Sequence, residues 1–112
     1  MKALVYEGPH NMPICDYPMC YPEAGQVKIK VKYCGICGSD LHGYTGASGR
    51  KIPPMVMGHE FSGVVTELGE GVTKFKVGDR VSVLPVEYCC ECEFCKRGAV
   101  NICANRRNLG VL

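Results

Sequence analysis

The chain has 112 residues, of which 46% are hydrophobic, and its formal net charge is only +2. This length fits one domain or part of one, and the small charge argues against a nucleic-acid or anionic membrane partner. No apolar run approaches the roughly 20 residues of a membrane span, and MKALVYEGPH at the N-terminus lacks the apolar core of a secretion signal. We therefore expect a cytoplasmic protein with no nucleic acid and no membrane as partners.

Fourteen glycines and seven prolines favour many turns between short strands over a helical bundle. In chain order, strands are expected at residues 2–6, 26–34, 60–68 and 80–84. In the second of these, Val27, Ile29, Val31 and Tyr33 alternate with lysines, which predicts one buried face and one solvated face. Gly63 predicts a bulge or a close backbone approach within the third. This pattern indicates a mainly β fold, an antiparallel barrel or sandwich.

The glycine-rich stretch 35–49 contains one possible short helix. Its expected N-cap is Ser39, because serine favours that position, and Asp40 and His42 would follow in the first turn. The chain ends on an apolar Val-Leu pair without a stop signal, which we interpret as a truncation.

Four cysteines, Cys89, Cys92, Cys95 and Cys103, lie within fifteen residues, with spacers of two, two and seven. Thiolates at this spacing can meet around one tetrahedral zinc ion, and four protein ligands would close the site and make it structural. The alternative is a disulfide framework. We disfavour it because C-x-x-C spacing rarely suits a disulfide pair, no secretion signal is present, and five further cysteines are an odd remainder.

A second group has a different composition. Cys37, His59 and Glu60 offer one sulfur, one nitrogen and one carboxylate, and such a trio with a fourth position open suits a catalytic zinc. Separately, Cys37 could be a small core residue and His59 a structural histidine. The neighbouring glycines of the GHE motif and the CGSDLH context favour the metal-site interpretation.

Three ordered motifs carry a family resemblance that covers essentially the whole chain. The chain resembles the zinc-dependent medium-chain dehydrogenase/reductase family in the motifs GHEFSGVVTELGEGV, CGICGSDLH and VGDRVSVLP, the last followed by the four cysteines. The sequences of these motifs look most like the polyol, butanediol and threonine dehydrogenase branch of that family. The resemblance implies a GroES-like (chaperonin-10-like), partly open barrel with short helices. Residues 1–112 would be the N-terminal part of the catalytic domain, with a structural zinc lobe at about 86–105 and without the Rossmann cofactor domain.

The resemblance also implies roles for individual residues. Zinc held by Cys37 and His59 would activate the hydroxyl of a secondary alcohol or polyol for hydride transfer to NAD or NADP. Ser39 would bind that hydroxyl and pass its proton toward His42, while Asp40 would orient His59. In the polyol-type members the glutamate that matches Glu60 ligates zinc directly or through water. In classical alcohol dehydrogenases it lies behind the metal, and a cysteine further along the chain is the third ligand.

The family normally has glycine at the position of Cys90, so this cysteine could compete with Cys89 for zinc or strain the backbone at a positive φ.

The longer parent is expected to be a homodimer or homotetramer. No G-x-G-x-x-G motif occurs in the 112 residues, so the chain alone is expected to be inactive. The alternatives are a stand-alone zinc-stabilised interaction module and a zinc ribbon that binds nucleic acid.

Overall fold

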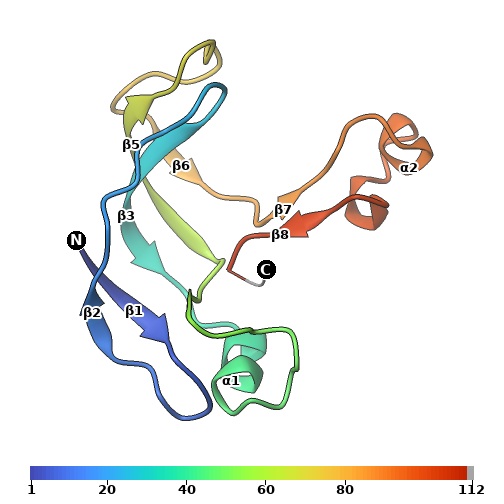
Figure 1. The fold of residues 1–112 in the computed structure, drawn as a ribbon. Helices are drawn as coiled ribbons and strands as arrows, with labels where there is room; N and C mark the ends of the chain where they lie inside the picture. Colours follow the sequence, from blue (N-terminus) through green and yellow to red (C-terminus); the bar gives the residue numbers. More distant parts are fainter. Residues whose placement is uncertain (111–112) are drawn as a thin grey trace.

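The computed structural model describes residues 1–110 and consists of short strands with a few short helices (Figure 1). The strands are β1 (Lys2–Tyr6), β2 (Ile14–Asp16), β3 (Val27–Cys34), β4 (Met55–Val56), β5 (Phe61–Leu68), β6 (Arg80–Ser82), β7 (Val86–Glu87) and β8 (Arg107–Asn108). The helices are α1 (Gly38–Tyr44), α2 (Glu93–Lys96) and the 3-10 turn η1 (Val100–Ile102). The predicted mainly β class is confirmed.

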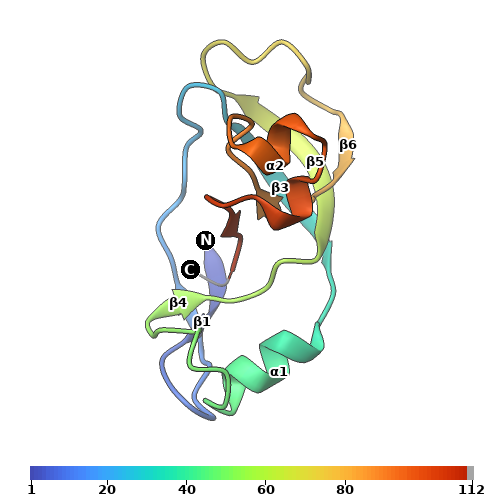
Figure 2. The ribbon, with the colours of Figure 1, turned by 90° about the vertical axis from the view of Figure 1, so that its right-hand side faces the viewer.

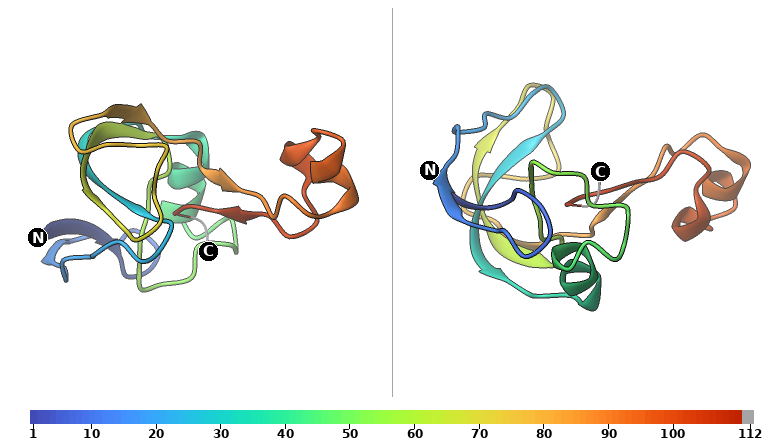
Figure 3. Two further views of the ribbon diagram at one scale, coloured as in Figure 1. Left: turned by 90° about the horizontal axis from the view of Figure 1, so that it is seen from above. Right: turned by 60° about the horizontal axis from the view of Figure 1, so that its bottom comes forward.

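The strands form three antiparallel sheets, ordered β2-β1-β4, β3-β5-β6 and β7-β8. Over the residues described these sheets do not join into one closed cylinder, which agrees with a partly open barrel. The β7-β8 ribbon carries α2 and η1 away from the other sheets as a separate lobe (Figure 3). The radius of gyration is 15.5 Å, against about 13 Å for a compact chain of this length, and the projecting lobe accounts for this elongation.

The β3–β5 pair is the longest in the molecule, and its register explains two features of the sequence. Gly63 is buried, and a Cβ there would collide with the carbonyl oxygen of Lys30, so the predicted close backbone approach is confirmed. The register shifts between Val31 and Tyr33, and these two side chains are 51% and 79% exposed. The predicted apolar face of this strand is therefore wrong beyond Ile29, because the irregular register interrupts the alternation.

The apolar core is small. Val5, Tyr6, Val65 and Cys103 are the buried hydrophobic residues of the described chain, while many large apolar side chains remain exposed. Outside this core, the Leu109 N–H donates to the Pro85 carbonyl at 2.9 Å and extends the pairing of β7 with β8. No helix in the described chain has the length and apolar character needed to cross a membrane.

Helix α1 lies at the opposite end of the molecule from the start of β3 and the end of β5 (Figures 1 and 2). It begins at Gly38 with Cys37 as its N-cap, so the prediction of Ser39 as the cap is wrong. The physical reason is that Asp40 accepts a hydrogen bond from the Cys37 N–H at 3.1 Å, which satisfies a free donor at the helix start. Ser39 is instead a residue of the first turn.

Candidate metal centres

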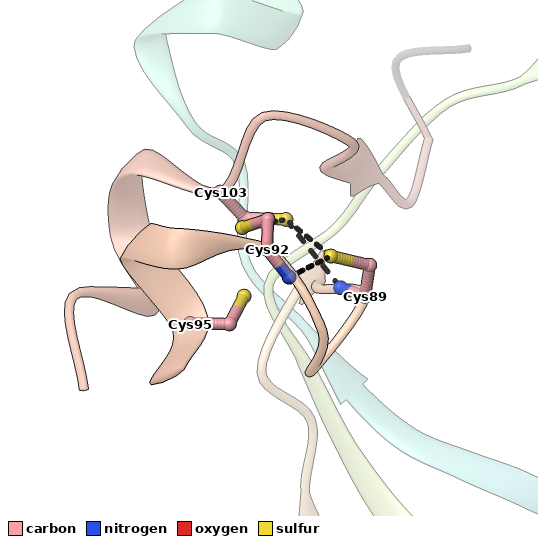
Figure 4. Close-up of side chains that lie close together, drawn as sticks. All are labelled: Cys89, Cys92, Cys95 and Cys103. Atoms are coloured by element: carbon pink, nitrogen blue, oxygen red, sulfur yellow. Dashed lines mark hydrogen bonds between the residues drawn. The ribbon is translucent and has the colours of Figure 1, made fainter. Parts of the chain in front are cut away.

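The four lobe cysteines converge on one point. Cys89 and Cys92 follow β7, Cys95 lies in α2, and Cys103 ends η1, and Figure 4 shows their sulfurs turned toward a common space. All four sulfurs lie within 4.8 Å of one another.

The sulfur separations fit tetrahedral zinc. The Cys89–Cys103 and Cys92–Cys103 sulfurs are 3.6 and 3.9 Å apart, and four Zn–S bonds of about 2.3 Å would place sulfurs about 3.8 Å apart. A disulfide bond requires about 2.05 Å, and all nine cysteines are free in the structure. The disulfide alternative is thus disfavoured by geometry as well as by spacing.

The polypeptide around the cluster stabilises negative charge unevenly. Backbone N–H groups of Cys95 and Ala104 lower the pKa of Cys92 to about 6. Those of Glu91 and Cys92 lower the pKa of Cys89. Burial, followed by the neighbouring Cys92 sulfur, raises the pKa of Cys95 to about 12. The cluster thus holds thiolate readily at two positions, and the charge of a bound divalent cation would favour deprotonation of Cys95.

Cys90 adopts a φ of 60°, in the left-handed region that favours glycine. The predicted positive φ is therefore present. The Cys90 side chain is exposed, and it is Cys89 whose sulfur lies with the other three.

The mixed trio is assembled by the pairing of β3 with β5. Cys34 at the end of β3 pairs with Phe61 at the start of β5, and the Gly35 N–H donates to the Glu60 carbonyl at 2.7 Å. Cys37 follows the end of one strand, while His59 and Glu60 precede the start of the other, so antiparallel pairing brings them together. Their ligand atoms lie within 4.8 Å of one another.

Asp40 contacts both neighbouring ligands. Its Oδ2 accepts the backbone N–H of Cys37 at 3.1 Å, and its Oδ1 lies 3.4 Å from Nδ1 of His59. That Nδ1 is buried and is not aligned for a hydrogen bond in the structure. Since Asp40 faces Nδ1, the other ring nitrogen remains for a metal, and this donor set of sulfur, imidazole and carboxylate fits zinc.

A cleft opens beside the trio. Ser39, Arg50 and His59 line it together with Pro85 and Asn108, on the segments that lead to and from the lobe. Ser39 and His42 stand three residues apart on α1, so they are neighbours on its surface, and both are exposed.

Sequence reasoning missed Lys51. This side chain is buried, and its Nζ lies 3.2 Å from Oδ1 of Asp40. No periodicity or motif marks it, because it stands in an irregular segment eight residues before His59.

Comparisons with known proteins agree with this geometry. The family model of the alcohol dehydrogenase GroES-like domain matches residues 23–111. Sorbitol dehydrogenase of Halalkalibacterium halodurans is 48% identical over 113 residues, which cover 98% of this chain and 33% of that protein.

Two solved structures share the fold. The cobalt- and zinc-bound thermostable alcohol dehydrogenase of Pyrobaculum aerophilum superimposes with a TM-score of 0.92 at 33% identity, over 100% of this chain and 35% of that one. An Escherichia coli CFT073 alcohol dehydrogenase complexed with NADH gives 0.90 at 44% identity, over 99% and 32%. The chain spans about a third of the length of these relatives. It belongs to the alcohol dehydrogenase GroES-like domain family.

Proposed function

We propose that this chain is the metal-binding part of an NAD- or NADP-dependent dehydrogenase that oxidises a secondary alcohol or a polyol. The observation that carries the proposal is the trio of Cys37, His59 and Glu60 beside a cleft, with its ligand atoms within 4.8 Å. A mixed donor set next to open space suits a metal that must also accept substrate, whereas the four-cysteine cluster suits a closed structural zinc.

Each residue then has a role. Cys37 and His59 hold the catalytic zinc with Glu60 as third ligand, and zinc supplies a Lewis acid that polarises the substrate hydroxyl. Ser39, which lines the same cleft as His59, accepts the proton of that hydroxyl. It donates its own to His42, whose exposed ring releases the proton to solvent. Asp40 orients the ring of His59.

The proposal extends to the rest of the enzyme. Residues 1–112 form the N-terminal part of the catalytic domain, with the structural zinc lobe at about 86–105. The dinucleotide binds to a Rossmann domain outside these residues, since they contain no G-x-G-x-x-G turn. The complete enzyme is a cytoplasmic homodimer or homotetramer, and it uses neither nucleic acid nor a membrane.

The test uses the complete protein, its metal content, and a panel of secondary alcohols and polyols with NAD and NADP. We expect alcohol-dependent reduction of one coenzyme. Ser39→Ala should lower kcat by about 10²–10⁴-fold, because it interrupts proton transfer. Ala47→Ser, an exposed change just beyond α1, serves as the control.

A complete protein that binds two zinc ions per chain but reduces neither coenzyme with any alcohol of the panel would contradict the proposal. It would favour the stand-alone interaction module instead.

A further inference from the structure

A buried lysine lies next to the mixed metal site and lines the same cleft as His59. Lys51 is only 7% exposed, and its side chain is 3% exposed. Its Nζ lies 3.2 Å from Oδ1 of Asp40 and also donates to the carbonyl oxygen of Gly110. Burial of a lysine is costly unless its charge is paired and hydrogen-bonded. Asp40 and the Gly110 carbonyl supply this pairing and hydrogen bonding for Lys51. The proposed reaction gives Lys51 no role.

The partner of Lys51 is the carboxylate that links two metal ligands. One oxygen of Asp40 accepts the backbone N–H of Cys37, and the oxygen that faces Lys51 also faces Nδ1 of His59. Any rotation of this carboxylate would change its contacts with both ligands. Lys51 restrains that rotation because it pairs with the same oxygen that faces His59.

Helix α1 provides space for the lysine stem. Gly43 is buried on this helix, and a Cβ there would lie 2.5 Å from Cγ of Lys51. Any larger residue at position 43 would therefore force the lysine stem to shift. At the other end, Gly110 follows β8, so the same ammonium group joins α1 to the segment that returns from the lobe.

A buried ion pair by itself is weak evidence for stability, because desolvation offsets much of the attraction. Its clearer contribution is orientation. Lys51 balances the charge of the Asp40 carboxylate, whose side chain is only 11% exposed. The imidazole ring of His59 then remains available as a metal ligand. Groups behind a metal ligand typically alter metal affinity by about 10–100-fold.

We propose that Lys51 is a positioning residue of the mixed metal site, which acts by fixing Asp40 and, through Asp40, the ring of His59. This inference rests on the proposed function only in that Cys37, His59 and Glu60 bind a metal ion.

The test measures cobalt(II) binding to the complete protein after the cysteine cluster has been filled with zinc. Lys51→Met should weaken cobalt binding at the mixed site by about 10–100-fold and alter its visible absorption bands. Lys51→Arg, which keeps the charge, should recover most of the affinity. Lys28→Met is the matched control, because it removes another lysine–carboxylate pair, with Glu67 at 2.6 Å, on the distant part of β3.

A double-mutant cycle separates positioning from general destabilisation. If Lys51 acts through Asp40, Lys51→Met should weaken cobalt binding little further once Asp40→Asn is present. If Lys51→Met prevents folding, Gly43→Ala replaces it, since that change crowds the lysine without removing its charge. It should produce the same spectral change.

The outcomes distinguish the two proposals. A complete protein that binds metal only at the cysteine cluster would contradict the proposed function. Normal cobalt binding with unchanged bands in Lys51→Met, or in Gly43→Ala where Lys51→Met does not fold, would overturn the Lys51 inference alone. Full additivity with Asp40→Asn would also overturn it.

Discussion

The two candidate metal centres are built in opposite ways. The four-cysteine cluster takes its ligands from fifteen consecutive residues on a lobe that projects from the other sheets. The mixed trio takes Cys37 from the start of α1 and His59 with Glu60 from the approach to β5. One centre is determined by local spacing, whereas the other exists only because β3 and β5 pair in one register.

The difference also separates their chemistry. Four sulfurs at tetrahedral separation leave no position for a substrate, and backbone N–H groups already stabilise thiolate there. The mixed trio lies beside a cleft, and Asp40 contacts Cys37 and His59 and pairs with the buried Lys51. The two candidate centres can therefore be perturbed independently, and substitutions at each of them test that independence.

The largest effect is expected from Cys95→Ser, which removes one ligand of the cluster. Structural zinc contributes about 10–16 kcal/mol in zinc-finger peptides, so the variant should lose one tightly held zinc ion, and amides of residues 86–108 should exchange rapidly. Zinc analysis after mild chelation and hydrogen exchange measure this. Cys20→Ser, at an exposed cysteine outside the cluster, is the control. Unchanged zinc content and exchange in Cys95→Ser would show that the cluster is not a zinc site.

The next effect concerns the mixed trio. His59→Ala should weaken the second metal equivalent by more than about 100-fold, because loss of a ligand costs more than loss of a group behind it. The cluster zinc should remain. Metal titration of the complete protein measures both equivalents, with His10→Asn as control, since His10 is exposed and asparagine tolerates its φ of 60°. Simultaneous loss of both metals would refute the independence of the centres.

A third experiment perturbs the sheet on which only the mixed trio depends. In Gly63→Ala the new methyl group meets the Lys30 carbonyl, which should lower the free energy of unfolding by about 1–3 kcal/mol. Metal affinity should fall at the trio but not at the cluster. Chemical denaturation and metal titration test this, and Ser62→Ala on the same strand is the control. Equal weakening of both centres would show that the lobe depends on the β3–β5 register too.

The smallest effect is expected at Cys90. Cys90→Gly should stabilise the zinc-loaded protein by about 1 kcal/mol, because glycine relieves the left-handed backbone at φ 60°. Thermal unfolding measures the gain, and Cys20→Gly should give none. Zinc content should not change, and a loss of zinc in Cys90→Gly would mean that Cys90 rather than Cys89 is a ligand.

How well a strand could be predicted from the sequence depended on its length. β1, β3 and β5 have five to eight residues, long enough to be recognised, and β3 also shows the alternation that marks a strand. β4, β7 and β8 have two residues each, too few for any periodicity, and sequence reasoning missed them. The helix cap was misplaced because the serine signal at Ser39 competed with a contact between Asp40 and Cys37 that only the folded turn displays.

The amino-acid sequence alone determined the family, the mainly β class and the membership of both candidate ligand groups. The four cysteines are close enough in sequence to converge whatever the rest of the chain does, whereas Cys37, His59 and Glu60 were grouped by their ligand chemistry and their motifs. Only the tertiary structure decided that Asp40 reaches two ligands at once and that Lys51 is buried against it. These contacts join a helix, an irregular segment and the residues after β8, so they depend on strand register and packing, which no local pattern records.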